Sequence, residues 1–378
     1  MPEGSAKETD TRTLTILAVS ATGGTVVEVY DFFIYGYAAA SAFPGISFPK
    51  LAPTQALVFS FLAFGAGFPA RILGAFIFGH FGDRTGRKFA FLVSIAIVGT
   101  TTCLTGLLPG YARLGIAAPV LLVVLRVVQG IGVSGEFGGT SSLLAEFGAA
   151  RRSRAFWMSL ATLGIPLGAI AASGVMLIMS KTFAVAGWRI AMLLSSVIVI
   201  PALLARYKLA DSPLFERLKQ RQQLAAMPSL GVFKMHAGSI ILLALVVAFM
   251  SMNGYVMGTY FISFMHFAGV PLATVAIVLM VGRVADALGV LLSGPLADFC
   301  KRRTAAYIAI GLTTLLSYPF VLAVLSKHIV LVTALQIPIG FFGIDSGAGI
   351  SWNLGQIFGG MLAPSALAAL IGQDVFHR

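Results

Sequence analysis

Long apolar runs recur from one end of the chain to the other, and they constrain its fold more than any other feature. Many of them exceed the 18 or so residues that a helix needs to cross about 30 Å of hydrocarbon. Charged residues make up only 11% of the 378 residues, against roughly 25% in ordinary soluble domains, so a soluble globule is excluded. The runs do not alternate as the strands of a transmembrane barrel do. We therefore expect an all-α membrane protein.

Proline, glycine and charged residues divide the apolar runs into about eleven predicted transmembrane helices. These helices are predicted at residues 14–40, 54–80, 89–109, 117–146, 155–180, 187–206, 238–265, 271–297, 304–326, 328–345 and 349–372. The fourth and fifth contain several glycines, including Gly130, Gly132 and Gly168. Small residues of this kind favour close helix contact over lipid exposure, so we expect both helices to pack inward.

A polar stretch rich in Gln, Arg and Lys separates the first six predicted helices from the other five. The predicted organisation is a tail at 1–13, a six-helix bundle at 14–206, a linker at 207–236 and an incomplete bundle of about five helices at 237–378. Lys and Arg gather on alternate connections, and such positive charges stay in the cytoplasm. We therefore expect a cytoplasmic N-terminus and several passes through the inner (plasma) membrane. The net charge of +12 is explained by this topology, without a nucleic-acid partner.

An internal repeat relates the two halves of the sequence. The segment GHFGDRTGRK, which starts at Gly79, recurs with the same spacing of Gly, Asp and basic residues as GPLADFCKRR, which starts at Gly294. Tandem halves are typical of secondary transporters, whose substrate site lies between the repeats. The offset of 215 residues predicts a complete second half ending near residue 421. We therefore expect either that the last helix of that half is absent from this sequence or that the second half is compressed.

Acidic residues inside the apolar runs are the first candidates for chemistry. Glu28 and Asp31 stand three residues apart in the first predicted helix and share one of its faces. A charged side chain at the centre of a membrane helix costs roughly 2.5–3.5 kcal/mol on insertion scales. Such residues must therefore face the bundle interior, find cationic partners or bind protons. We predict proton coupling at Glu28, Asp31 and Glu136, and a structural ion pair that closes the bundle is the alternative.

Arg126 and Gln129 of the fourth predicted helix are candidates for substrate binding, together with Tyr30, Tyr35 and Arg71. The planar guanidinium group of an arginine can bind a carboxylate through two parallel, charge-assisted hydrogen bonds. A permanent salt bridge between Arg126 and one of the acidic residues is the alternative. Both descriptions can hold in different conformations, because the arginine can exchange a protein carboxylate for a substrate carboxylate.

Arg283 and Asp286 form a further charged pair, again three residues apart. Long arginine side chains near helix ends often extend to the membrane interface, so the sequence leaves open whether Arg71 and Arg283 line the transport path. The sequence has no Walker-type phosphate loop, and Cys103 and Cys300 lack ligand-type neighbours. We therefore predict no enzyme activity, no metal site and no cofactor, with a proton gradient as the energy source.

These motifs together resemble one family. GHFGDRTGRK resembles the loop between the second and third helices of the major facilitator superfamily. The segments VVEVYDFFIYGYAAA, FPARILGAFIFG, RVVQGIGVSGEFGG and DSPLFE resemble its metabolite:proton symporter branch, nearest to shikimate-type carriers. The resemblance covers about residues 14–345, and SGAGISWNLGQIFGGMLAP is similar to the eleventh helix of that family. It implies two six-helix bundles that rock about a central site.

The resemblance also implies a gate latch on the cytoplasmic side, in which the acidic residue of the loop pairs with an arginine across the bundle. In this sequence the gate latch would consist of Gly79, Gly82, Asp83, Arg84, Gly86, Arg87, Lys88 and Asp298. The second copy departs from the first, with Phe299 and Cys300 where the first has Arg84 and Thr85. The connection after the tenth helix is also short, and we expect the twelfth helix to be absent.

The predicted function is secondary active transport. The resemblance implies symport of protons with a small organic acid or a zwitterion, and we expect a monomer in the lipid bilayer. Two alternatives stay open. The segment TLGIPLG in the fifth helix suggests proton-coupled efflux, and the shortened second half suggests a truncated family member that does not transport.

Overall fold

The computed structural model describes residues 11–85, 87–147, 154–207, 269–299 and 302–341, with residues 238, 241, 262, 264 and 265. All regular elements in these ranges are helical. They are α1 (Thr11–Ser41), α2 (Phe43–Ser47), α3 (Pro53–Gly65), α4 (Gly67–Thr85), α5 (Arg87–Leu107), α6 (Tyr111–Leu114), α7 (Ala117–Phe147), α8 (Arg154–Thr162), α9 (Gly164–Ile178), a π-helical turn (Phe183–Gly187), α10 (Trp188–Tyr207), α14 (Leu272–Phe299), α15 (Arg302–Leu325) and α16 (Ile329–Phe341).

Most predicted helices agree with the observed ones to within a few residues, but two of them are divided. The predicted helix at 54–80 is interrupted at Ala66 between α3 and α4. The one at 155–180 is interrupted at Leu163, between α8 and α9. Pro166 explains the second break, because its nitrogen has no hydrogen to donate to the preceding turn. The predicted helix at 349–372 and most of that at 238–265 lie outside the described residues.

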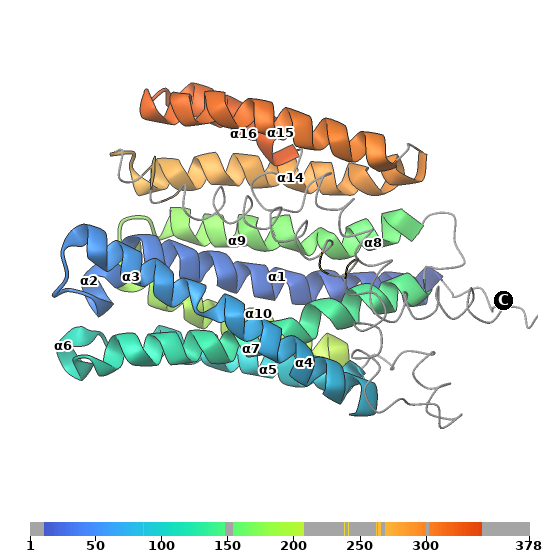
Figure 1. Cartoon of the computed structure of the whole chain (residues 1–378), viewed down its shortest axis with the longest axis horizontal. Coiled ribbons are helices and arrows are strands. Elements are labelled where there is room, and N and C mark those ends of the chain that lie inside the picture. Colours follow the sequence, from blue (N-terminus) through green and yellow to red (C-terminus); the bar gives the residue numbers. More distant parts are fainter. Residues whose placement is uncertain are drawn as a thin grey trace, which may run out of the picture.

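The helices lie in layers, and α1 is in the middle (Figure 1). On one side of α1, α8 and α9 separate it from α14, α15 and α16; on the other side lie α4, α5, α7 and α10. The contact of α14 with α8 and α9 joins the two bundles. Within the described part of the chain, Pro53–Phe81, Ala117–Gly135 and Leu272–Ser293 are long and apolar enough to cross a membrane.

Glycines allow the closest helix contact of the first bundle, between α4 and α7. A Cβ atom at Gly130 of α7 would overlap the carbonyl oxygen of Gly67 on α4. Seven residues further along α4, a Cβ atom at Gly74 would overlap the carbonyl oxygen of Ile131. The two backbones therefore touch directly, and no larger residue fits at either position. The inward packing predicted for this glycine-rich helix is confirmed.

The second bundle repeats this contact between α14 and α16. A Cβ atom at Gly340 of α16 would overlap the carbonyl oxygen of Gly282 on α14, and one at Gly289 would overlap that of Phe341. The α14 glycines follow their α4 counterparts by 215 residues, which is the offset of the sequence repeat, and the α16 residues follow their α7 counterparts by 210. The internal repeat is therefore present in the helix packing as well as in the loop motif.

We expect Gly130→Ala and Gly340→Ala to destabilise the protein. Each added methyl group would overlap a backbone oxygen that cannot move away as a side chain can, and overpacking of this kind typically costs about 1–3 kcal/mol. Thermal unfolding in detergent would measure the change as a lower melting temperature.

Gly174→Ala in α9 is the matched control, because no described atom lies within 4 Å of a Cβ atom there. An alanine in that helix interior should leave stability unchanged or raise it by roughly 0.5–1 kcal/mol. Equal melting temperatures for all three variants would contradict the close helix contacts.

Candidate functional site

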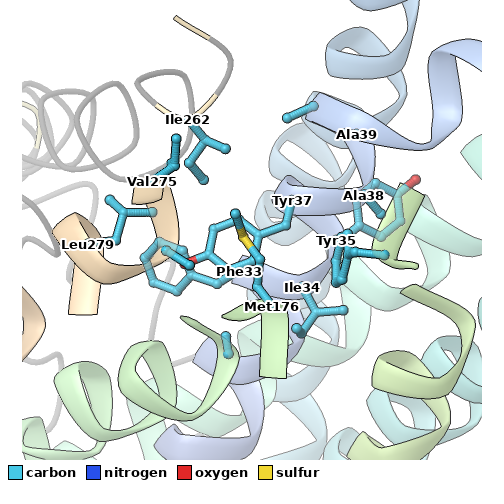
Figure 2. Packing of buried hydrophobic residues seen from close by; sticks show 14 of the residues in the cluster. Phe33, Ile34, Tyr35, Tyr37, Ala38, Ala39, Met176, Ile262, Val275 and Leu279 are labelled. Atoms are coloured by element: carbon cyan, nitrogen blue, oxygen red, sulfur yellow. The ribbon is translucent and has the colours of Figure 1, made fainter. Parts of the chain in front are cut away.

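Helix α1 presents two different faces to its neighbours. Phe33 and Tyr37, four residues apart, point from α1 towards Val275 and Leu279 of α14 (Figure 2). The hydroxyl groups of Tyr37 and Ser173 on α9 are 2.9 Å apart and share a hydrogen bond. Tyr35 lies on the other side of α1. One face of α1 therefore meets the second bundle, and the other points into the first.

Asp31 is buried on the inner face of α1 and is linked to Arg126 through one amide. The Oδ2 atom of Asp31 accepts hydrogen bonds from Thr102 Oγ1 on α5 and from Gln129 Nε2 on α7, the latter at 3.0 Å. The Oε1 atom of Gln129 accepts a hydrogen bond from Arg126 Nη1 at 2.5 Å. Gln129 therefore bridges a buried acidic group of α1 and a buried basic group of its own helix, α7.

Aromatic rings cover the guanidinium group of Arg126. Its Cζ atom lies 4.4 Å from the ring centre of Tyr35, 4.8 Å from that of Phe64 and 5.9 Å from that of Phe32. A cation over an aromatic face is stabilised most where water is excluded, and Arg126 is only 5% exposed. Its Nε atom also donates to the carbonyl oxygen of Phe64 at 3.2 Å. Phe64 is in the last turn of α3, where carbonyl groups lack a partner in their own helix.

Glu28 has a different cationic neighbour from Asp31. An oxygen of Glu28 lies 3.6 Å from Arg71 Nη1 on α4, and Arg71 also lies over the ring of Phe68, at 5.4 Å from its centre. Arg71 is the more exposed member of this ion pair, with 28% of its side chain accessible against 11% for Glu28. The shared helix face predicted for Glu28 and Asp31 therefore meets two separate arginines, Arg71 and Arg126.

The structure does not bring every predicted residue to this site. The hydroxyl group of Tyr30 donates to the carbonyl oxygen of Ala191 on α10 at 2.9 Å, so this side chain packs between α1 and α10. Tyr35 lies against Arg126, and its hydroxyl group has no hydrogen-bond partner among the described residues. Glu136 follows Gln129 by about two turns on α7, but its side chain lies outside the described residues.

The gate latch stays a prediction. Gly79 on α4 is exposed, and no described atom lies within 4 Å of its Cβ position. The other members lie outside the part of the chain whose side chains are described: Gly82, Asp83, Arg84, Gly86, Arg87, Lys88 and Asp298.

Thr102 and Phe64 belong to the site and are not found by reasoning from the sequence. Thr102 is the last of three consecutive threonines in an apolar helix, and this run was the available signal. Thr101 bonds to the carbonyl oxygens of Ile97 and Val98 on its own helix, whereas Thr102 reaches Asp31. Phe64 takes part partly through its backbone, for which no sequence pattern exists.

No metal site is visible in the described ranges, where no three His, Cys, Asp or Glu side chains gather closely enough to hold an ion. Cys103 on α5 is a free thiol.

Comparisons with known proteins agree with this arrangement. Residues 16–232 match the family described as "Sugar (and other) transporter". The chain is 35% identical to the inner membrane metabolite transport protein YhjE of Escherichia coli (strain K12), with 92% of this chain and 86% of that protein covered. It is 32% identical to the shikimate transporter of the same organism, with 94% and 87% covered.

Among solved structures, that of the D-xylose-proton symporter matches with a TM-score of 0.65 over 94% of this chain and 87% of that one. The sequence identity is 17%, so this likeness concerns the fold alone. The relatives are named as transporters, and the helix contacts repeat between the two bundles as tandem transporter halves require. The chain belongs to the sugar and metabolite transporters of the major facilitator superfamily.

Proposed function

We propose that this multi-pass transporter is a proton-coupled symporter that takes up a small organic acid or a related metabolite across the inner membrane by alternating access. The observation that carries the proposal is the link from Asp31 through Gln129 to Arg126. Two relatives support it, one named as a shikimate transporter and one as an inner membrane metabolite transport protein. A protein of the same fold is named as a proton symporter.

Asp31 is the proposed proton-binding group. Its Oδ2 atom accepts two hydrogen bonds, whereas its Oδ1 atom is buried with no hydrogen-bond partner among the described residues. A charged oxygen left in this condition inside an apolar bundle costs free energy. Protonation of Oδ1 removes the negative charge without breaking the bonds to Oδ2. The carboxyl group can therefore gain and lose a proton while it stays in place.

The bridge through Gln129 couples this proton to an anion. When Asp31 is ionised, its negative charge compensates the positive charge of Arg126. When Asp31 is protonated, Arg126 loses the compensating charge of Asp31, and a negatively charged substrate between the bundles is favoured. Linkage is reciprocal, so the bound anion in turn favours protonation of Asp31. Proton and anion therefore enter and leave together.

The remaining parts of the proposal concern topology. We place the N-terminus and the linker at 207–236 in the cytoplasm, with the bundles at 14–206 and 237–378 acting as the moving halves. Asp83 and the basic residues that follow it would close the cytoplasmic side. Protons and the organic acid are the only partners that this cycle needs besides the bilayer.

No observation specifically favours efflux. The glycines of TLGIPLG, Gly164 and Gly168, are explained by packing, because a Cβ atom at either would lie 2.6 Å from a backbone oxygen of α1, that of Thr22 or Val26. The pattern therefore reports contact between α1 and α9 rather than a direction of transport.

We expect purified protein in liposomes to accumulate shikimate when the outside is made acidic. One proton carried with a monoanion moves no net charge, so a membrane potential alone should have little effect. The pH difference supplies about 1.36 kcal/mol per unit, or tenfold accumulation. Uptake of radiolabelled shikimate with and without a protonophore measures this. Uptake that survives collapse of the gradient would contradict symport, and accumulation driven only from an acidic interior would show efflux.

Asp31→Asn should separate the proton from the substrate. The amide keeps an acceptor for Thr102 but cannot bind or release a proton. We therefore expect loss of gradient-driven accumulation, with shikimate exchange across the membrane retained in counterflow assays. Full accumulation by this variant would show that Asp31 does not carry the coupled proton.

Arg126→Lys should abolish most transport although the charge is kept. A lysine cannot bond to Gln129 Oε1 and the carbonyl oxygen of Phe64 while lying flat on Tyr35, because it lacks the planar, forked donor group. We expect at least a tenfold loss of uptake, an estimate from the strength of charge-assisted hydrogen bonds. Arg113→Lys, at an exposed arginine of α6, is the matched control. Equal uptake by both variants would remove Arg126 from the mechanism.

A further inference from the structure

Arg283 of α14 is a fully buried charge, like Asp286 three residues further along the same helix, and the mechanism above leaves both unused. It is 0% exposed, and its Nε, Nη1 and Nη2 atoms have no hydrogen-bond partner among the described residues. Its Cζ atom lies 4.7 Å from the ring centre of Phe33 on the outer face of α1. A buried guanidinium group with no acceptor for any donor is costly. Its position between the bundles therefore calls for an anionic partner.

The internal repeat shows what surrounds Arg283. On the offset of 210 that relates α7 to α16, Gln336 is the counterpart of Arg126. In the first bundle, Arg126 lies beside Gly67, where a Cβ atom would be 3.3 Å from Arg126 Nε. Gly282 is the counterpart of Gly67 and makes the same helix contact. From this correspondence we infer that Gln336 lies next to Gly282, the residue that precedes Arg283.

Gln336 is a buried polar residue with an acceptor atom that no described residue satisfies. It is 1% exposed, and its Oε1 atom has no hydrogen-bond partner among the described residues. In the first bundle the corresponding position is an arginine whose charge is already bonded within the protein, to Gln129 and to the Phe64 carbonyl oxygen. In the second bundle the buried arginine is on α14 instead. The nitrogen donors of Arg283 and the acceptor oxygen of Gln336 both lack a hydrogen-bond partner among the described residues.

We propose that Arg283 and Gln336 form the site that binds the anionic end of the transported molecule. The proposal rests on the proposed function, whose substrate class it narrows to a carboxylate that also carries a hydrogen-bond donor. The guanidinium group of Arg283 donates to the carboxylate, the ring of Phe33 covers one face of that guanidinium, and Gln336 Oε1 accepts from a hydroxyl group of the substrate. In this arrangement Arg126 interacts with Asp31, which binds the proton, and Arg283 binds the anion.

Two variants in the full-length protein test this site. Arg283→Met removes the charge and keeps an apolar stem of similar length. Gln336→Glu places a carboxylate where the substrate's own would lie, so that Arg283 acquires a permanent partner. Thermal unfolding in detergent, with shikimate as the probe, measures both the stability of each variant and its ligand-induced shift.

We expect the wild-type protein to be stabilised by shikimate, and both variants to need at least tenfold more shikimate for the same shift. Without shikimate, Arg283→Met should melt at or above the wild-type temperature, because a buried guanidinium group without a hydrogen-bond acceptor among the described residues is removed, and Gln336→Glu should melt higher. Benzoate, which has a carboxylate but no hydroxyl group, should bind the wild type more weakly than shikimate. Neutral methyl shikimate should bind Arg283→Met and the wild type alike.

Arg189→Met and Gln55→Glu are the matched controls. Arg189 bonds to the carbonyl oxygen of Leu108 and lies over Trp188, and Gln55 is exposed at the start of α3. Both controls should keep the wild-type response to shikimate.

The outcomes separate this inference from the proposed function. A wild-type shikimate shift in both variants overturns the inference and leaves gradient-driven uptake untouched. A melting temperature lowered by Arg283→Met, together with an unchanged ligand shift, shows a structural pair with Asp286 and also overturns it. If shikimate binds through Arg283 but uptake ignores the pH gradient, the anion site stands and symport fails. If the wild type binds no carboxylate, both fail.

Discussion

The bridge formed by Gln129 is the interaction on which the rest of the first bundle depends. A carboxylate and a guanidinium group are both expensive inside apolar helices, and here each is stabilised through the same neutral amide. Because Asp31, Thr102 and Arg126 come from α1, α5 and α7, the bridge also fixes how these three helices face one another. A change of charge at Asp31 therefore changes the surroundings of Arg126 through Gln129.

The two bundles share a backbone arrangement but not a distribution of charge. The glycine contacts of α4 with α7 and of α14 with α16 are the same, since in both bundles a glycine lies against a backbone carbonyl group. The side chains around them have diverged: the counterpart of Arg126 is Gln336, and the counterpart of Phe68 is Arg283. Such a repeat gives both bundles the same backbone arrangement, while their different side chains allow them to bind different ions.

Much of the fold follows from the sequence, because helix length, glycine content and the repeated loop each act over short distances along the chain. The common face of Glu28 and Asp31 is equally local. Their interaction partners are not local. The spacing along the sequence predicts a shared helix face, but it does not predict that Glu28 contacts Arg71 while Asp31 contacts Thr102. Tyr30 shows the same limit, because its neighbour Asp31 points into the bundle while Tyr30 itself bonds to α10.

The different surroundings of the two buried arginines bear directly on how symport can work. If both guanidinium groups were bonded within the protein, an anion would gain little by entering. If neither were, the empty carrier would hold two uncompensated charges. In the proposed cycle, the empty state has an ionised Asp31 that compensates Arg126, and the loaded state has a protonated Asp31 and an anion bound at Arg283. Since proton and anion bring opposite charges, the net charge between the bundles is the same in both states. With equal net charge, the membrane potential acts equally on the loaded and the empty carrier as each crosses between the two conformations.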